Sequence, residues 1–322
     1  MICLGFDTSN YTTSTAAYDE GTQLNIRRIL TVGQGERGLR QSDAVFQHLK
    51  ELPELFSELA EKIDKKEVLA VGVSTRPRSV EGSYMPVFLA GEGYARVCAD
   101  SLGVPLYRFS HQDGHIMAGI YSCHEFELLS KKFISVHLSG GTCEILLCRY
   151  NGYNFDCEII GGSRDISAGQ LIDRVGVKMG LQFPCGKELE QIAKKACDVI
   201  SLPVNTDGEY INFSGIETKA ISLIGKENDE SLAKSLFVSV AKALERTLNH
   251  CIKKYEIENV LIVGGVASNS IIKENLNLCA KKHFASVEYS TDNAVGIAIL
   301  AHMANKGAGT NGENNCHSVT AQ

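Results

Sequence analysis

The chain has 322 residues, 44% of them hydrophobic, and a formal net charge of −6. This composition allows a large buried core, most simply in two domains. The excess of acidic over basic residues argues against a protein that binds nucleic acid by itself through a continuous basic surface. A nucleic-acid substrate would need a local basic patch or a basic partner. No segment has the pattern of a signal peptide or the roughly 20 apolar residues of a membrane span. We therefore expect a cytoplasmic protein without membrane attachment.

Eleven cysteines are scattered through the chain, and none forms a C-x-x-C pair. Several lie within apolar runs, where reduced cysteine behaves as a small hydrophobic residue. The pattern indicates free thiols rather than disulfides or a zinc–thiolate site.

The same succession of elements occurs twice. Residues 1–30 predict an apolar strand, a polar turn at residues 7–12 and two further strands, and residues 133–160 predict the same order. A strand–loop–helix unit follows each meander later in the chain, at residues 68–80 and 259–272. This duplication is typical of the α/β actin-like fold of actin, hexokinase and Hsp70, in which two lobes face a nucleotide cleft.

The duplication also predicts the domains. We expect an N-terminal lobe over residues 1–110, joined by the last helix at about residues 292–304, and a C-terminal lobe over residues 111–291. Residues 306–322 are rich in Gly, Asn and Thr and predict a disordered tail.

The stretch from Phe133 to Cys148 predicts a buried hairpin around the turn Ser139-Gly140-Gly141-Thr142. Two glycines without Cβ atoms allow a ligand to approach the backbone, and the turn can direct N–H groups and two hydroxyls at an anion. We expect a phosphate there. The alternative is a tight turn without a ligand.

A pair of histidines marks a candidate metal site. Ser110 and Asp113 form a capping box that predicts a helix start at about His111. His111 and His115 then project from one face, where one ion can bridge them. The helix N-terminus should keep both rings neutral, and metal affinity should fall on acidification. Asp292, predicted at another helix start, would complete a site for zinc or ferrous iron, unless it serves only as an N-cap.

With these features in order, the chain resembles the TsaD family, the threonylcarbamoyl transferases of tRNA once described as O-sialoglycoprotein endopeptidases. The resemblance rests on HQDGH, HLSGGTCEI, FPCG, NFSGIETKA, IVGGVASNS and STDNAVGIA. These segments occur in the family's order and cover nearly the whole chain up to the tail.

The resemblance implies a metal and an adenine nucleotide, with Mg²⁺ as a further possible ion. His111, His115 and Asp292 would ligate iron or zinc, and Asp7 would join the two histidines as a catalytic residue. The nucleotide is expected at a larger set of residues. The phosphates would lie at Leu138, Ser139, Gly140, Gly141 and Thr142, and the ribose and base at Asp173, Gly186, Gly264, Gly265 and Asn269.

The reaction implied is transfer of a threonylcarbamoyl group from threonylcarbamoyl-AMP to N6 of the adenosine next to the anticodon of tRNA. The tRNA would bind through partner proteins, one of them similar to TsaB, and the chain could form a dimer. For Asp173 and Asn269, the alternatives from the residues alone are a solvated helix carboxylate and a helix N-cap.

Three departures from the family keep other functions open. The first turn reads DTSNYTT instead of E-T-S-C-D-E-T, the G-P-G-L loop is replaced by Thr75–Ser79, and SGGHT has lost its histidine. The alternatives are a carbamoyltransferase or ATPase acting on a small molecule, with Arg76 and Arg78 binding its carboxylate, and a non-catalytic nucleotide-binding partner. A peptidase is disfavoured because Gln112 replaces the glutamate of H-E-x-x-H.

Overall fold

The computed structural model describes residues 1–9, 11–20, 22–32 and 39–310. The chain divides into two compact units, and the division falls inside one helix, after Ala118. Unit 1 comprises Met1–Ala118, Asn151–Asn154 and the segment from Asp292 onward; unit 2 comprises Gly119–Tyr150 and Phe155–Thr291. The helices of the described residues do not include one that is long and apolar enough to cross a membrane.

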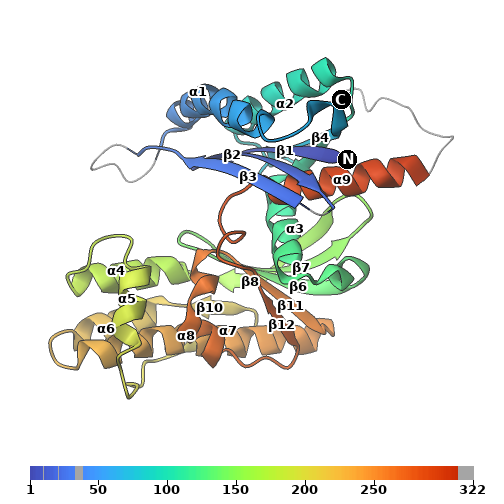
Figure 1. The fold of residues 1–322 in the computed structure, drawn as a ribbon. Coiled ribbons are helices and arrows are strands. Elements are labelled where there is room, and N and C mark those ends of the chain that lie inside the picture. The colour runs from blue at the N-terminus through green and yellow to red at the C-terminus, as the bar shows by residue number, and fades with distance from the viewer. Residues whose placement is uncertain (10, 21, 33–38, 311–322) are drawn as a thin grey trace. The chain divides into compact units, whose positions relative to one another are not determined.

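Unit 1 is built on a five-stranded sheet with the order β3-β2-β1-β4-β5 (Figure 1). The first three strands form an antiparallel meander, and β4 and β5 run parallel to β1. The strands are β1 (Ile2–Ser9), β2 (Thr12–Asp19), β3 (Thr22–Ile29), β4 (Val68–Arg76) and β5 (Leu106–Ser110).

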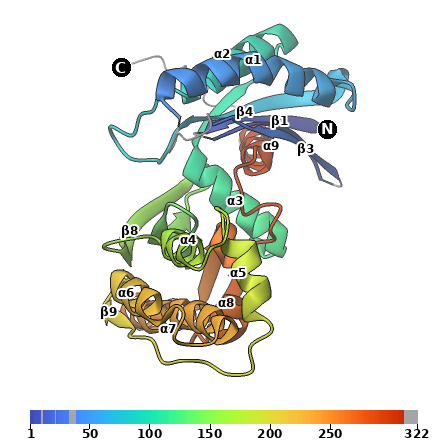
Figure 2. The ribbon, with the colours of Figure 1, turned by 90° about the vertical axis from the view of Figure 1, so that its left-hand side faces the viewer.

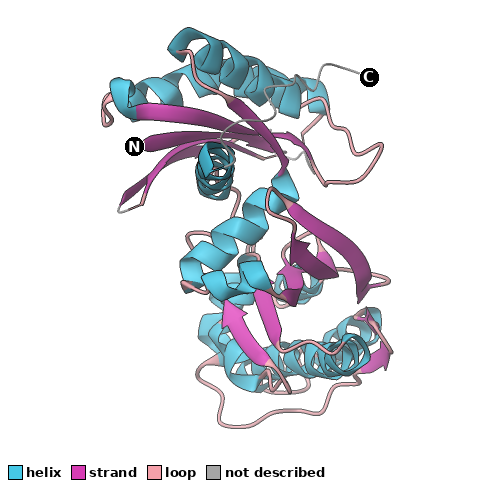
Figure 3. Cartoon of the chain, turned by 90° about the vertical axis from the view of Figure 1, so that its right-hand side faces the viewer, coloured by secondary structure: helices cyan, strands magenta, loops and turns pink. Residues whose placement is uncertain are grey.

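Helices cover both faces of this sheet (Figure 3). The helices α1 (Gln41–Ala60) and α2 (Phe88–Leu102) lie on one face and α9 (Val295–Thr310) on the other (Figure 2). Two strand glycines let α9 approach closely, because a Cβ at Gly5 would lie 2.4 Å from the Ala294 carbonyl oxygen and one at Gly72 2.8 Å from that of Ile297. The short helix η1 (Lys65–Glu67) precedes β4.

The helix α3 (His111–Cys123) begins where the capping box predicts. The Ser110 Oγ accepts from the Asp113 backbone N–H at 3.1 Å, and the Asp113 carboxylate accepts from the Ser110 N–H at 2.8 Å. These reciprocal bonds satisfy two donors at the helix start. The start of α3, where His111 and His115 lie one turn apart, is therefore held firmly.

Unit 2 repeats the topology of unit 1 in a seven-stranded sheet with the order β12-β11-β6-β7-β8-β10-β9. The meander β6-β7-β8 is antiparallel, and β11 and β12 run parallel to β6, as β4 and β5 run parallel to β1. The strands are β6 (Lys132–Leu138), β7 (Cys143–Tyr150), β8 (Phe155–Ser163), β9 (Asn205–Asp207), β10 (Tyr210–Asn212), β11 (Asn259–Val263) and β12 (Lys281–Phe284). The duplication and the actin-like fold are thus confirmed.

The core of unit 2 lies between this sheet and its helices, and α7 contributes most to it. Sixteen of the 27 residues of α7 are buried, so this helix is apolar over much of its circumference. The helices are α4 (Ala168–Lys178), α5 (Gly186–Ala193), α6 (Ser214–Leu223), α7 (Asp229–Tyr255), α8 (Ser270–Asn275), η2 (Phe126–Ser130) and η3 (Gly265–Ser268).

Two expectations from the sequence need correction. Residues 7–9 belong to β1 and are buried, so the first turn is shorter than residues 7–12. At the other end, α9 begins at Val295 and continues to Thr310, so residues 306–310 are helical and do not belong to a tail. The remainder of the predicted tail, residues 311–322, lies outside the described residues.

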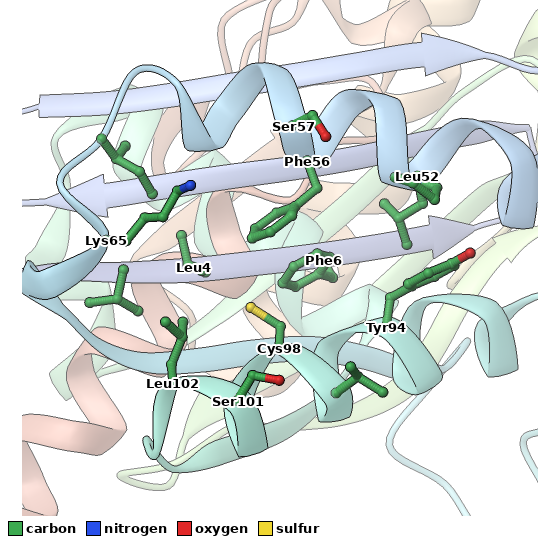
Figure 4. Close-up of a pocket in the computed structure, with 14 residues that line it drawn as sticks. Leu4, Phe6, Leu52, Phe56, Ser57, Lys65, Tyr94, Cys98, Ser101 and Leu102 are labelled. Carbon is green, nitrogen blue, oxygen red and sulfur yellow. The ribbon is translucent and has the colours of Figure 1, made fainter.

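An apolar cavity of about 390 Å³ lies between α1, α2 and the sheet of unit 1 (Figure 4). Leu4 and Phe6 of β1, Phe56 of α1 and Cys98 of α2 point into it (Figure 4). The Lys65 side chain lines one end of the cavity. The outer faces of α1 and α2 also carry exposed large apolar side chains, among them Phe46, Leu49, Leu89 and Val97.

Candidate metal centre and phosphate loop

The three predicted metal ligands lie together within unit 1. His115 Nε2 is 3.2 Å and His111 Nε2 is 3.5 Å from Asp292 Oδ1, and one ligand atom from each residue lies within 4.8 Å of the other two. The two imidazole rings meet edge to face with centroids 4.4 Å apart. Two residues of α3 and one residue 177 positions beyond His115 therefore share a single locus.

Asp292 is not the N-cap of α9. The helix begins three residues later at Val295, whose N–H donates to Asn293 Oδ1 at 3.1 Å. Arg27 Nη1 of β3 donates to the Asp292 backbone carbonyl at 3.3 Å. The Asp292 carboxylate thus contacts the histidines, while its backbone carbonyl accepts from Arg27 of β3.

Asp7 supports His111 from the opposite side of the ring. Its Oδ2 lies 2.6 Å from His111 Nδ1, and its Oδ1 accepts from Ser74 Oγ at 2.8 Å. Asp7 is only 1% exposed, so it is a buried partner of His111 and does not line an open surface. A carboxylate at Nδ1 selects the tautomer with the proton on that nitrogen and orients Nε2 toward Asp292.

The carboxylates control the ionisation of His111 in the metal-free site. Burial disfavours the charged ring, but Asp7 and Asp292 outweigh burial and raise the pKa of His111 to about 10. Burial alone would raise the pKa of Asp292, yet hydrogen bonds from His111 and His115 hold it well below its usual range. The helix N-terminus favours a neutral His111 ring, and the two nearby carboxylates act on the pKa in the opposite direction.

The donor set fits a zinc or ferrous ion. Ligand atoms about 2.1 Å from a tetrahedral ion lie roughly 3.4 Å from one another. The distances of 3.2 and 3.5 Å to Asp292 Oδ1 are close to this spacing. Two imidazoles and one carboxylate suit either metal and leave positions for substrate oxygens or water.

The loop that follows β4 packs onto the start of α3. The Gln112 N–H donates to the Pro77 carbonyl at 3.0 Å, and Ser79 Oγ donates to Asp113 Oδ2 at 2.8 Å. Arg76 stands directly opposite Ser110 in the pairing of β4 with β5, and it is partly exposed. The loop at residues 75–79 is therefore hydrogen-bonded to the helix that carries both histidines.

The turn between β6 and β7 in unit 2 is held as a compact loop. The Ser139 N–H donates to the Thr142 carbonyl at 2.9 Å, and the Thr142 N–H donates to Ser139 Oγ at 3.0 Å. The Cβ positions of Gly140 and Gly141 face open space, with nothing within 4 Å. A ligand can therefore approach this backbone as the sequence predicts, whereas the Leu138 side chain is fully buried and offers only main-chain atoms.

The start of α4 supports the loop from behind. Ser167 Oγ donates to the Gly140 carbonyl at 2.5 Å, and the Gly169 N–H donates to the Ser139 carbonyl at 3.3 Å. A Cβ at Gly169 would lie 2.4 Å from Gly140 Cα, so only glycine permits this approach. The carbonyls of Ser139 and Gly140 are consequently engaged by the start of α4.

Asp173 and Gly186 lie next to each other. Asp173 on α4 accepts from the Cys185 N–H at 2.8 Å, and Gly186 is the first residue of α5 with open space at its Cβ position. Burial raises the pKa of Asp173. One oxygen of the Asp173 carboxylate thus accepts a hydrogen bond from the connection between α4 and α5.

The residues that follow β11 differ in whether a ligand could reach them. Gly264 has φ = +105°, and a Cβ there would lie 2.4 Å from the Leu138 carbonyl oxygen, so this glycine is required by packing. Gly265 faces open space. Asn269 is 6% exposed, and its Oδ1 accepts from the Ile272 N–H at 3.0 Å, which makes it the N-cap of α8. The alternative reading of Asn269 as a cap describes its side chain correctly.

Two supporting residues were missed from the sequence. Ser74 contacts Asp7 only because β1 and β4 pair in parallel, and no local pattern predicts that pairing partner. Ser167 supports the Gly140 carbonyl, and here a signal exists, since Ser167 and Gln170 form an S-x-x-Q capping box.

The duplicated sheets and the turn at residues 139–142 define a protein of the actin-like nucleotide-binding class, with a candidate His–His–Asp metal centre. Solved structures agree on the fold. T. kodakarensis HypF matches with a TM-score of 0.62 and 16% identity over 95% of this chain and 48% of its own. The activator of 2-hydroxyisocaproyl-CoA dehydratase from Clostridium difficile matches with a TM-score of 0.53 and 18% identity, covering 98% of this chain and 100% of its own.

The family model of TsaD, described as tRNA N6-adenosine threonylcarbamoyltransferase, matches residues 34–299, so the chain belongs to this family. Relatives with that description include proteins of Carboxydothermus hydrogenoformans and Mycoplasmopsis synoviae. The first is 28% identical over 94% of this chain and 91% of its own, and the second 27% identical over 95% and 99%. This chain is a divergent member of the family.

Proposed function

We propose that this chain transfers a threonylcarbamoyl group from threonylcarbamoyl-AMP to N6 of the adenosine next to the anticodon of tRNA. Membership of the family supports the reaction class. The observation that carries the proposal is the convergence of His111, His115 and Asp292, backed by Asp7, in a chain whose first turn departs from the family pattern. The binding chemistry is retained although neighbouring residues have changed.

We assign iron or zinc to His111, His115 and Asp292. A bound ion there supplies Lewis-acid stabilisation of negative charge on substrate oxygens. Asp7 keeps a proton on His111 Nδ1 and thereby directs Nε2 at the ligand position, and Ser74 orients Asp7. Asp7 is thus proposed as a positioning residue, which refines its predicted catalytic role.

The turn at residues 139–142 is proposed as the phosphate site, with Mg²⁺ as a possible companion ion. Its two open glycines and the Thr142 hydroxyl supply donors to phosphate oxygens. Asp173, Gly186 and Gly265 are proposed to contact ribose and base. The leaving group is AMP, so orientation and charge neutralisation by the chain serve the transfer better than an enzyme nucleophile would.

A protein similar to TsaB is proposed to dock on the outer faces of α1 and α2. Phe46, Leu89 and Val97 are each more than half exposed there, and the apolar cavity of Figure 4 lies between the same helices. Exposed apolar residues over a cavity are typical of protein interaction sites. A basic partner would also supply the tRNA contacts that a chain of net charge −6 lacks.

The test is transfer by the purified chain, with and without the partner, from threonylcarbamoyl-AMP to unmodified tRNA. Digestion of the tRNA and mass spectrometry should detect the modified nucleoside, and Asp292→Ala should abolish it. Glu258→Ala, which removes a strongly exposed carboxylate of unit 2 away from α1 and α2, is the control. Absence of the modified nucleoside with metal-loaded protein and partner would overturn the proposal.

The second candidate is transfer to, or phosphate release with, a small molecule. It is favoured by Arg76, which stands opposite Ser110 beside the histidine helix and has no counterpart in the family's G-P-G-L loop. A panel of carboxylate-bearing acceptors assayed for AMP or phosphate release tests it. Loss of that release in Arg76→Ala, with tRNA modification unchanged, would establish this function.

A non-catalytic role, as a dimer partner or scaffold in a multi-protein modification complex, is the remaining alternative. It would lead if metal analysis found neither iron nor zinc and ATP gave no thermal shift.

A further inference from the structure

Two thiols face each other across the β7–β8 hairpin. Cys148 of β7 and Cys157 of β8 are directly opposed in the antiparallel pairing, and their Sγ atoms lie 3.3 Å apart. Neither cysteine forms a disulfide in the structure. Neither residue belongs to the metal centre or to the phosphate loop.

The backbone already has the geometry of a disulfide. Directly opposed residues in an antiparallel pair have Cα atoms about 4.5 or 5.5 Å apart, and both values lie within the roughly 4.4–6.8 Å range of disulfides. The two sulfur atoms have to approach from 3.3 Å to about 2.05 Å. Rotation of the two side chains shortens this distance.

The two thiols differ in accessibility. Cys148 is 1% exposed, whereas Cys157 is partly exposed. A surface cavity of about 260 Å³ reaches both cysteines and is also lined by Lys132, Arg149, Asp156 and Glu158. An oxidant that enters this cavity meets Cys157 first. The two cationic side chains can attract its carboxylates, and the two acidic ones can pair with its amino group.

We propose that Cys148 and Cys157 form a reversible redox modification site for a small disulfide such as glutathione disulfide. The Cys157 thiolate attacks one sulfur of the oxidant, the oxidant's S–S bond breaks, and one glutathione thiolate leaves. The Cys148 thiol then loses its proton to solvent and attacks Cys157 Sγ, which releases the second glutathione. Two protein thiols are oxidised to one disulfide, and one glutathione disulfide is reduced to two thiols.

The exchange has a structural consequence. The link joins the two strands close to the hairpin turn, next to the Arg149–Asp156 and Tyr150–Phe155 pairs, and the turn, Asn151–Asn154, groups with unit 1. Tyr153 in that tip donates to the Arg108 carbonyl at 3.1 Å and accepts from the Arg108 N–H at 3.2 Å. Oxidation should therefore stiffen the β7–β8 hairpin near its turn and raise the thermal unfolding temperature.

The experiment exposes the full chain to glutathione disulfide and analyses intact mass and peptides under non-reducing conditions. The exposed thiols Cys197 and Cys279 are first replaced by serine in all samples, so that they cannot react. The expected product has lost two hydrogen masses, carries a crosslink between residues 148 and 157, and reverts with dithiothreitol. Thermal unfolding should shift upward on oxidation and return on reduction.

Two single variants separate the roles. Cys148→Ser should trap one glutathione on Cys157, and Cys157→Ser should remain unmodified at Cys148 because that thiol is buried. Matched thermal unfolding of the reduced variants excludes misfolding as the cause. A stable glutathione adduct on Cys157 in the parent protein, or no reaction at either cysteine, would overturn the proposal, and neither outcome bears on transferase activity.

Discussion

The proposed metal centre of unit 1 and the proposed phosphate loop of unit 2 differ in how their groups are arranged. In unit 1 the proposed ligands contact one another, and His111 also contacts Asp7. In unit 2 the loop carbonyls are engaged from behind by α4, while Gly140 and Gly141 face open space. Histidines and carboxylates can pair with one another, which stabilises their charges at short range. A phosphate site instead needs hydrogen-bond donors that a ligand can reach.

The largest effect should come from breaking the first region. Replacing Asp292 by Ala removes the carboxylate ligand that both histidines contact, so iron or zinc bound per chain should fall from about one to near zero. Transferase activity should fall by more than roughly 100-fold, because even outer partners of metal ligands cost 10–100-fold. Elemental analysis and nucleoside mass spectrometry measure the two effects.

The outcome that contradicts this is unchanged metal content in Asp292→Ala. Glu258→Ala, which removes an exposed carboxylate of unit 2, should leave both measurements at the parent values.

Metal affinity should depend steeply on pH. The pKa of His111 is raised to about 10 in the metal-free site, so binding has to displace that proton at neutral pH. Apparent affinity should therefore rise with pH, about tenfold per unit below pH 10, or roughly 100-fold from pH 6 to pH 8. Competition titrations with a chelator at several pH values measure this slope.

In His111→Gln the slope should be shallower by one proton, with weaker binding throughout. An affinity of the parent protein that does not vary between pH 6 and pH 9 would show that His111 is neutral before the metal binds.

Asp7→Asn tests the positioning role. The amide can still occupy the space beside His111 Nδ1, but it lacks the charge that holds the proton there, so metal affinity should fall about 10–100-fold. The same variant should lower the pKa of His111 and flatten the pH slope, which a purely structural role would not do. Ser74→Ala, one hydrogen bond further away, should have the same sign and a smaller size.

The smallest effect, and the sharpest test of the second region, is Gly141→Ala. The added methyl meets no protein atom within 4 Å, so thermal unfolding should be unchanged, while AMP or ATP affinity should fall by about tenfold if phosphate lies on this backbone. Calorimetric titration and a melting curve measure the two quantities.

Two other glycines calibrate that result. Gly93→Ala, on the exposed side of α2, should change neither property. Gly264→Ala should instead destabilise the fold by about 1–3 kcal/mol, because its φ of +105° and its contact with the Leu138 carbonyl exclude a side chain. Unchanged nucleotide affinity in Gly141→Ala would remove the loop from the nucleotide site.

Local sequence patterns predicted much of this structure. The start of α3 follows from the capping box of Ser110 and Asp113, and the hairpin at residues 139–142 follows from two apolar runs around paired glycines. The cap at Asn269 is local as well, since its side chain accepts from the Ile272 N–H three residues further on. Asp7, in contrast, is buried in β1 and takes its partners from β4 and α3.

The amino-acid sequence by itself determined the duplicated fold, the helical spacing of His111 and His115 and the open glycines of the loop, because each depends on residues close together in the chain. Only the tertiary structure decided that Asp292 joins the histidines, that Asp7 and Ser74 stand behind His111, and that Cys148 faces Cys157. Those contacts depend on strand order and register. The free energies that set order and register are summed over whole sheets and are not encoded in any single motif.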